Sequence, residues 1–217
     1  MSGAPQSAAE ARRPIPSRGT AWARWMTARL AATRITPNQI SQLGLAMAVL
    51  AGLALLAAPA AGGWFGAGLL VTAVALIGLR LLCNMLDGLL AVEARRGALD
   101  GAFWNEVPDR LADCAILIGA GFGLGAGSLG LAAALAAVLT AYIRVFGAAL
   151  GQPADFRGPL AKPQRMAVLA LAGLVDAALL ATGGAAAALE LALWVVLTGA
   201  LLTAARRTRT LRSRLAG

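Results

Sequence analysis

The sequence predicts an all-α integral membrane protein with six transmembrane helices. Of its 217 residues, 59% are hydrophobic and only 13% are charged, and the mean hydropathy is +0.73. Six apolar segments approach the roughly 20 residues that a helix needs to cross a bilayer. They cover residues 40–61, 64–91, 109–124, 129–150, 166–182 and 185–205. Because lipid offers the backbone no hydrogen-bonding partner, each segment is expected to form a helix.

Two segments are expected before the first span. Residues 1–19 are polar and contain proline, which predicts a flexible cytoplasmic arm, and they lack the continuous apolar core of a cleaved signal peptide. Residues 20–35 intersperse Trp22 and Trp25 with arginines, a pattern typical of a juxtamembrane amphipathic helix that lies on the inner leaflet. A disordered basic arm is the alternative for this second segment.

The six-helix domain is expected to extend over residues 36–205. The Thr-Pro-Asn sequence at its start predicts a turn into the membrane, with Asn38 as a candidate helix cap. The segment that begins at Asp109 has the weakest hydropathy of the six because it opens with charged residues. Close helix packing is predicted by small residues at four-residue spacing, which are Gly119, Gly123 and Gly127.

Basic residues predict the orientation in the membrane. They gather before the first span, between the second and third, between the fourth and fifth, and in a basic tail at 206–217, whereas the other three loops carry no charge. Since cytoplasmic loops retain Lys and Arg, both termini are expected in the cytoplasm. The Ala- and Arg-rich composition favours a bacterial inner membrane over an organelle. Anionic lipid headgroups then explain the net charge of +9, and no nucleic-acid partner is expected.

The composition excludes chemistry based on histidine or on clustered thiols. The chain has no histidine, and its two cysteines, Cys83 and Cys114, both fall within predicted spans. Structural zinc sites and iron–sulfur sites need more of these ligands. No disulfide is expected either.

A line of polar side chains interrupts two of the apolar helices between positions 84 and 113. At helical spacing, Asn84, Asp87 and Ala91 share one face of the first helix. The second helix repeats its own set every four residues, namely Gly101, Asn105, Asp109 and Asp113. Ionisable residues within spans are functional candidates because they are costly to bury in lipid. The two stripes are expected to face each other.

The oxygen atoms in this region suit a hard divalent cation. They come from the carboxylates of Asp87, Asp109 and, as a further candidate, Glu106, and from the amides of Asn84 and Asn105. Such a set favours Mg²⁺, Mn²⁺ or Ca²⁺ at the cytoplasmic ends of the two helices. The alternative is structural, with hydrogen bonds between helices and with Arg80 and Arg110 pairing with aspartates. Asp113 is expected to serve packing by orienting one of these arginines.

The loop at 151–166 contains the chain's only lysine. Its turn-forming residues are expected to bring Arg157, Lys162 and Arg165 to the cytoplasmic mouth of the site, where they can bind a phosphate of donor or acceptor. Arg144, just inside the preceding helix, is a further candidate for acceptor binding. The alternative is that these basic residues only follow the positive-inside rule.

These residues resemble the signature of the CDP-alcohol phosphotransferase family, DxxDGxxAR followed after eight residues by GxxxDxxxD. Seven positions fall at the signature spacing, namely Asn84, Asp87, Gly88, Ala91, Gly101, Asn105 and Asp109. The resemblance covers the whole chain, since the family has six transmembrane helices, a cytoplasmic juxtamembrane helix and a TPNxxS-like sequence such as residues 36–41. It also implies a homodimer.

The resemblance implies transfer of a phosphatidyl group from a CDP-alcohol, commonly CDP-diacylglycerol, to a hydroxyl acceptor, with release of CMP in phospholipid biosynthesis. Mg²⁺ or Mn²⁺ between the helices would neutralise the diphosphate, and Asp109 would take the acceptor proton. Asp87 would bind metal and, together with Gly88, Ala91 and Gly101, would contact the nucleotide.

Three positions depart from the signature. Asn84 and Asn105 stand where it has its first and third aspartates, and Val92 stands where it has arginine. With two fewer carboxylates, metal binding is expected to be weaker, and a site for one ion and a site for two ions are both compatible with the sequence. Glu106 is the candidate to compensate.

Two other functions remain open. The alternative to the transferase, motivated by Asn84, Asn105 and Val92, is a catalytically degenerate member that acts as a membrane partner or scaffold. A small transporter is the third possibility. Polar residues that cluster at one depth, with uncharged outer loops, argue against it.

Overall fold

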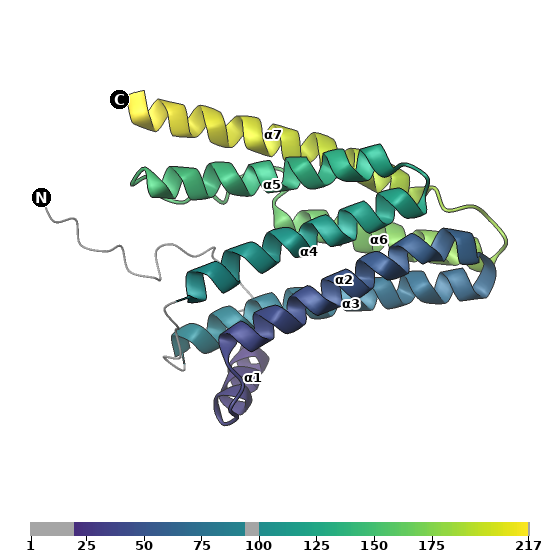
Figure 1. Ribbon diagram of the computed structural model, residues 1–217, viewed down its shortest axis with the longest axis horizontal. Helices are drawn as coiled ribbons and strands as arrows, with labels where there is room; N and C mark the ends of the chain where they lie inside the picture. The colour runs from purple at the N-terminus through teal and green to yellow at the C-terminus, as the bar shows by residue number, and fades with distance from the viewer. Residues whose placement is uncertain (1–19, 94–99, 217) are drawn as a thin grey trace, which may run out of the picture.

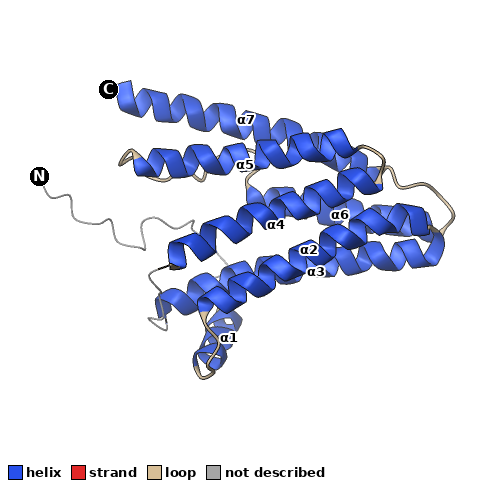
Figure 2. Cartoon of the chain, in the orientation of Figure 1, coloured by secondary structure: helices blue, strands red, loops and turns tan. Residues whose placement is uncertain are grey.

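The computed structural model describes residues 20–93 and 100–216, and every regular element in these ranges is a helix (Figures 1 and 2). Six of the helices form an elongated bundle, and α1 projects from one end of it (Figure 1). The described ranges contain α1 (Ala21–Ala31), α2 (Pro37–Ala61), α3 (Gly63–Glu93), α4 (Gly101–Gly123), α5 (Gly127–Ala149), α6 (Lys162–Ala181) and α7 (Ala188–Ala216). The predicted arm at 1–19 lies outside the described residues.

Five of these helices, α2, α3, α5, α6 and α7, are long and apolar enough to cross a membrane. The helix α4 does not meet the same criterion, because it carries four charged side chains, Glu106, Asp109, Arg110 and Asp113. It nevertheless lies within the bundle and packs against α2 and α5. Its polar residues therefore face protein, which is where ionisable groups in a membrane protein are tolerated.

The start of α2 is fixed by a reciprocal cap. The Thr36 side chain accepts from the backbone N–H of Gln39 at 3.2 Å, and the Gln39 side chain accepts from the backbone N–H of Thr36 at 3.0 Å. The expectation that Asn38 caps this helix is wrong. Asn38 is one residue inside α2, and its amide donates instead to Asp100 Oδ1 at 3.0 Å, just before α4 begins. The two helix starts are thereby tied together.

Glycines bring α2, α4 and α5 into backbone contact. A Cβ added to Gly119 would collide with the backbone of Gly52, and one added to Gly123 would collide with the carbonyl of Leu55. On the other side of α4, Gly121 meets Gly130 of α5 in the same way. Without a hydrophobic driving force in lipid, such close approach is a main source of helix association. The predicted packing is confirmed for Gly119 and Gly123, whereas a Cβ at Gly127 would meet only the ring of Phe122.

The loop after α5 folds back into the bundle, so that α6 begins part of the way along it (Figure 1). Gly158, at φ 151°, lies so close to Thr203 of α7 that a Cβ would overlap it. The Leu160 N–H donates to Thr203 Oγ at 3.3 Å, and the Leu160 side chain fills the space above Gly199. Ala161 is buried. These contacts with α7 place Lys162, the first residue of α6, inside the protein.

The other end of the bundle is closed by Asp176 of α6. This fully buried carboxylate accepts from the backbone N–H groups of Ala187, Ala188 and Leu189 at 2.8–2.9 Å. It thus satisfies the free donors at the start of α7, as an N-cap residue would. From there α7 runs without a break to Ala216, through the arginines of the predicted basic tail.

Candidate active site

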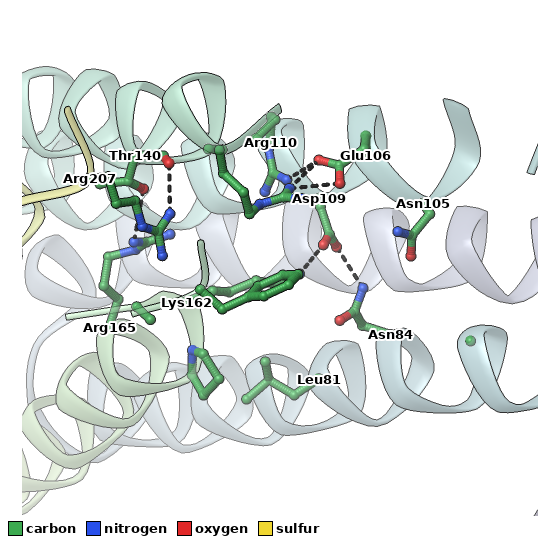
Figure 3. A pocket seen from close by; sticks show the side chains of 16 residues that line it. Leu81, Asn84, Asn105, Glu106, Asp109, Arg110, Thr140, Lys162, Arg165 and Arg207 are labelled. Carbon is green, nitrogen blue, oxygen red and sulfur yellow. Dashed lines mark hydrogen bonds and ion pairs between the residues drawn. The ribbon is translucent and has the colours of Figure 1, made fainter. Parts of the chain in front are cut away.

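A cavity of about 280 Å³ opens between the end of α3 and the beginnings of α4 and α6. Figure 3 shows side chains from α3, α4, α5, α6 and α7 that converge on it. The sequence-predicted residues that line it are Asn84, Gly88, Asn105, Glu106, Asp109, Arg144, Lys162 and Arg165. The two polar stripes therefore do face each other, as their four-residue spacing predicted.

Asp109 lies at the centre of this arrangement, with both carboxylate oxygens engaged (Figure 3). Its Oδ1 accepts from the amide of Asn84 at 2.8 Å and from Arg80 at 3.3 Å. Its Oδ2 forms an ion pair with the ammonium group of Lys162. Asn84 is therefore a hydrogen-bond donor to a carboxylate, at the position where the signature has an aspartate. An aspartate there would repel Asp109 unless a cation lay between them.

Asp87, one turn further along α3, has a different environment. It is buried, and its Oδ2 accepts from Ser41 of α2 at 2.6 Å. Its Oδ1 is buried without a hydrogen-bond partner among the described residues. A second cavity, of about 10 Å³, lies here between α2, α3 and α4 and is lined by Asp87, Asn84, Asp109 and Arg80 among others. This volume holds about one water-sized object.

Asp113, one turn deeper in α4, joins two buried arginines. Its Oδ1 accepts from Arg80 and its Oδ2 from Arg165, both at 2.9 Å. The expected pairing with Arg80 is confirmed. Arg110 instead pairs with Glu106, which lies one turn earlier on the same helix. Arg165 is almost fully buried and also donates to the Leu160 carbonyl at 3.1 Å, so it supports the loop before α6 as well.

Glu106 binds arginines on the opposite side of the cavity. Both of its oxygens accept from Arg144 of α5 at 2.7 Å, and one also pairs with Arg110 (Figure 3). The Arg144 guanidinium lies 5.3 Å from the ring centroid of Phe156, which holds it from the other side. Glu106 therefore fixes two cations at the cavity wall.

Arg157 does not line the cavity. It is exposed, and its guanidinium pairs with Asp155 of the same loop at 3.0 Å. Burial raises the pKa of Asp155, but the hydrogen bonds and charge of Arg157 outweigh this and hold that pKa below its ordinary value. Of the three basic residues expected at the mouth, Lys162 and Arg165 reach the cavity and Arg157 remains outside.

The remaining predicted residues occupy the rim or lie away from the cavity. Asn105 lines the cavity, is exposed, and has no hydrogen bond drawn to it in Figure 3. A Cβ on Gly101 would meet open space, so no close approach requires glycine there. Ala91 is half-buried, one turn beyond Gly88. Sequence reasoning missed Ser41 as the partner of Asp87, although Ser41 ends the TPNxxS-like stretch that drew attention to residues 36–41.

The donor chemistry fits one hard cation better than two. Carboxylate and amide oxygens are suitable ligands, and the unpartnered Oδ1 of Asp87 is available to an ion. The described residues contain no group of three or more acidic, histidine or cysteine side chains arranged to hold a metal. Asp109 offers no oxygen that is not already in contact with a cation or a donor.

Solved structures with this fold include two of a phosphatidylinositol phosphate synthase from Mycobacterium tuberculosis. The one with CDP-DAG bound matches with a TM-score of 0.70 and 21% identity, over 86% of this chain and 91% of the other. The one in complex with manganese and citrate matches with a TM-score of 0.70 and 22% identity, over 86% and 87% of the two chains. At this identity the likeness shows a shared fold.

Relatives in sequence include phosphatidylinositol phosphate synthases of Mycolicibacterium smegmatis and Mycobacteroides abscessus. They are 29% and 30% identical to this chain over 187 residues, which are 82% of this chain and 78% of each relative. A bifunctional IPC transferase and DIPP synthase of Rubrobacter xylanophilus is 39% identical over 160 residues, or 70% of this chain, but the match spans only 34% of that longer protein.

No family model matches the chain. The membership rests instead on the synthases, which align along most of their own length, and on a shared fold. Four of the seven signature positions, Asn84, Gly88, Asn105 and Asp109, line one cavity between α3 and α4. The chain belongs to the CDP-alcohol phosphotransferase family, together with the phosphatidylinositol phosphate synthases.

Proposed function

We propose that this protein is a membrane transferase that moves a phosphatidyl group from a CDP-alcohol, CDP-diacylglycerol in the first instance, to a hydroxyl acceptor with release of CMP. The observation that carries the proposal is the convergence of Asn84, Gly88, Asn105 and Asp109 on one cavity of about 280 Å³. The names of the relatives and the CDP-DAG in one of the similar structures support the same chemistry.

A divalent cation, Mg²⁺ or Mn²⁺, belongs to this proposal. Asp87 would hold it through Oδ1, with the amide oxygens of Asn84 and Asn105 as neutral ligands, and we assign Glu106 to the arginines rather than to the metal. When bound, the ion supplies charge neutralisation at the diphosphate of the donor. The manganese in one similar structure supports a metal of this kind.

Asp109 is the proposed general base. It lines the cavity, and its carboxylate oxygens contact Lys162 and Arg80. The acceptor hydroxyl would transfer its proton to Asp109 as its oxygen forms a bond to the phosphorus of the phosphatidyl group. The bond from that phosphorus to the CMP oxygen breaks in the same displacement, and CMP leaves with the electron pair.

The nucleotide and the acceptor would bind on different walls of the cavity. We assign the nucleotide to the α3 and α4 side, with Asp87, Gly88, Ala91 and Gly101 as in the signature. Cations on the opposite wall would bind a phosphate of acceptor or lipid, and these are Arg144 and Lys162, with Arg165 in support. Arg157 contributes charge only at the outer surface.

The placement in the membrane follows from the same proposal. Together with the five apolar helices, α4 would be the sixth span, and α1 would lie on the inner leaflet with Trp22 and Trp25 exposed to lipid. The cavity would then open toward the cytoplasm, with both chain ends on that side. A homodimer in the inner membrane is part of this proposal.

The test is CMP release by the purified protein, with CDP-diacylglycerol, Mn²⁺ and a panel of phosphorylated and unphosphorylated alcohols. We expect release that needs metal and one class of acceptor, and a loss of at least about 10²-fold in kcat for Asp109→Ala. The matched control is Asp155→Ala, which removes a carboxylate outside the cavity and should keep wild-type turnover. A folded wild type that releases no CMP with any acceptor would favour the scaffold function instead.

A further inference from the structure

We infer that the ammonium group of Lys162 is the resident cation of the Asp109 carboxylate, and that the site therefore takes one divalent ion, at Asp87. This inference rests on the metal site of the proposed function. It assigns to Lys162 a positioning role inside the site, in addition to any contact with substrate. The charges that matter belong to one cluster of buried and half-buried side chains. Its members are Asp87, Asp109, Asp113, Arg80, Lys162 and Arg165.

The cluster balances its charges without any added ion. Three carboxylates are matched by three basic side chains, all contributed by α3, α4 and α6. Asp113 uses one oxygen for Arg80 and the other for Arg165. Asp109 uses Oδ1 for Arg80 and Asn84, and Oδ2 for Lys162. Of these three carboxylates, only Asp87 keeps an oxygen without a partner in the described part of the chain.

Lys162 is held at this position by the fold around it. Only 14% of its side chain is exposed, and its ammonium group is buried beside Asp109. The residues before it are fixed on α7 by the bond from Leu160 to Thr203, and Ala161 is buried. A second divalent ion at Asp109 would have to displace this ammonium group or lie next to it, and like charges at such a distance repel strongly in a partly dry site.

The small cavity beside Asp87 is the proposed position of the single ion. The cavity of about 10 Å³ is bordered by Asp87, Asn84 and Asp109, and of the carboxylate oxygens there Asp87 Oδ1 is the one without a hydrogen-bond partner in the described part of the chain. Its size suits one ion or one water molecule. Arg80 also borders it, which limits the positive charge that the cavity can accept. The arrangement therefore predicts one bound ion.

The experiment counts Mn²⁺ ions on the full-length protein in detergent, from the loss of the free-Mn²⁺ EPR signal. We expect one ion per chain in the wild type and in Lys162→Arg, which keeps the cation. We expect a second, weaker site in Lys162→Met, because Asp109 Oδ2 becomes available. Arg157→Ala is the matched control, since it removes a basic residue of the same loop that is paired outside the cluster.

Other counts overturn the inference. Two ions on the wild type would mean that Lys162 moves aside, zero would mean that water fills the small cavity, and one ion on Lys162→Met would mean that Lys162 blocks nothing. If Lys162→Met fails to fold, the wild type still decides, because either a count of two ions or a Lys162 labelling rate that rises at saturating Mn²⁺ overturns the inference. As the chain's only lysine, Lys162 can be followed by amine labelling and mass spectrometry, and its labelling rate should not rise at saturating Mn²⁺.

The inference and the proposed function can fail separately. A wild type that releases CMP but binds two ions would overturn only the role given to Lys162. A wild type that binds one ion and releases no CMP with any donor or acceptor would overturn only the transferase.

Discussion

Replacing Asn84 by Asp tests how the site depends on its amide. In the wild type the Asn84 amide donates to Asp109 Oδ1 at 2.8 Å. In Asn84→Asp two carboxylate oxygens would face each other at that separation, and two unit charges there repel by about 6 kcal/mol at an effective dielectric constant of about 20. Arg80 and Lys162 offset much of this repulsion. We therefore expect the free energy of unfolding to fall by about 2 kcal/mol, which lowers Tm by roughly 5 °C for a protein of this size.

The assay is thermal unfolding of Asn84→Asp in detergent, with and without Mn²⁺. A cation between the two carboxylates would reverse the loss, because an ion at 100 times its Kd adds about 2.7 kcal/mol of stability. The matched control is Asn105→Asp. This side chain is exposed at the cavity rim, so the added charge should change Tm little without metal. Asn84→Asp with an unchanged Tm, or with a loss that Mn²⁺ does not restore, would refute the reasoning.

Three further predictions concern residues around the site. Asp113→Asn leaves two buried arginines with a weaker partner, so it should lower the free energy of unfolding, measured by thermal unfolding, by about 3 kcal/mol. Asp155→Asn, in a more exposed pair, should lower it by less than about 1 kcal/mol. Gly119→Leu should abolish a monodisperse peak in size-exclusion chromatography, because α2 and α4 can no longer touch, whereas Gly68→Leu, facing open space, should not. Arg144→Ala should raise KM for a phosphorylated acceptor at least about 10-fold and that for CDP-diacylglycerol less than about 2-fold; equal changes in both would contradict the two-wall assignment.

The helices and the facing polar stripes could be predicted because their signals are local. Apolar length identifies a span, and four-residue spacing puts Asn105 and Asp109 on one face whatever surrounds the helix. The same reasoning placed the glycines of α4 correctly, since small residues at this spacing have one common use in lipid. The start of α2 was less certain, because Thr36 and Asn38 are both acceptable cap residues and only the structure shows the reciprocal bond with Gln39.

The partners of the aspartates could not be predicted, because they come from distant parts of the chain. Ser41 and Asp87 are 46 positions apart, and Arg165 and Asp113 are 52 apart. Sequence reasoning placed Lys162 at the cytoplasmic mouth of the site, as a candidate phosphate contact. It did not predict the ion pair with Asp109, which forms because the preceding loop folds onto Thr203 and the small surface of Gly199. No local pattern in residues 151–161 signals that return into the bundle.

The two asparagines and the buried lysine have one electrostatic explanation. Three carboxylates and three basic side chains leave the cluster neutral. One divalent ion would then give it a net charge of +2, which complements the anionic diphosphate of a CDP-linked donor, whereas a second ion would raise that charge to +4 in a partly buried site. Further carboxylates at Asn84 and Asn105 would be needed to hold that second ion, and the internal cation at Lys162 would have to leave. The amides and the lysine therefore act in the same direction, toward a site that requires one ion.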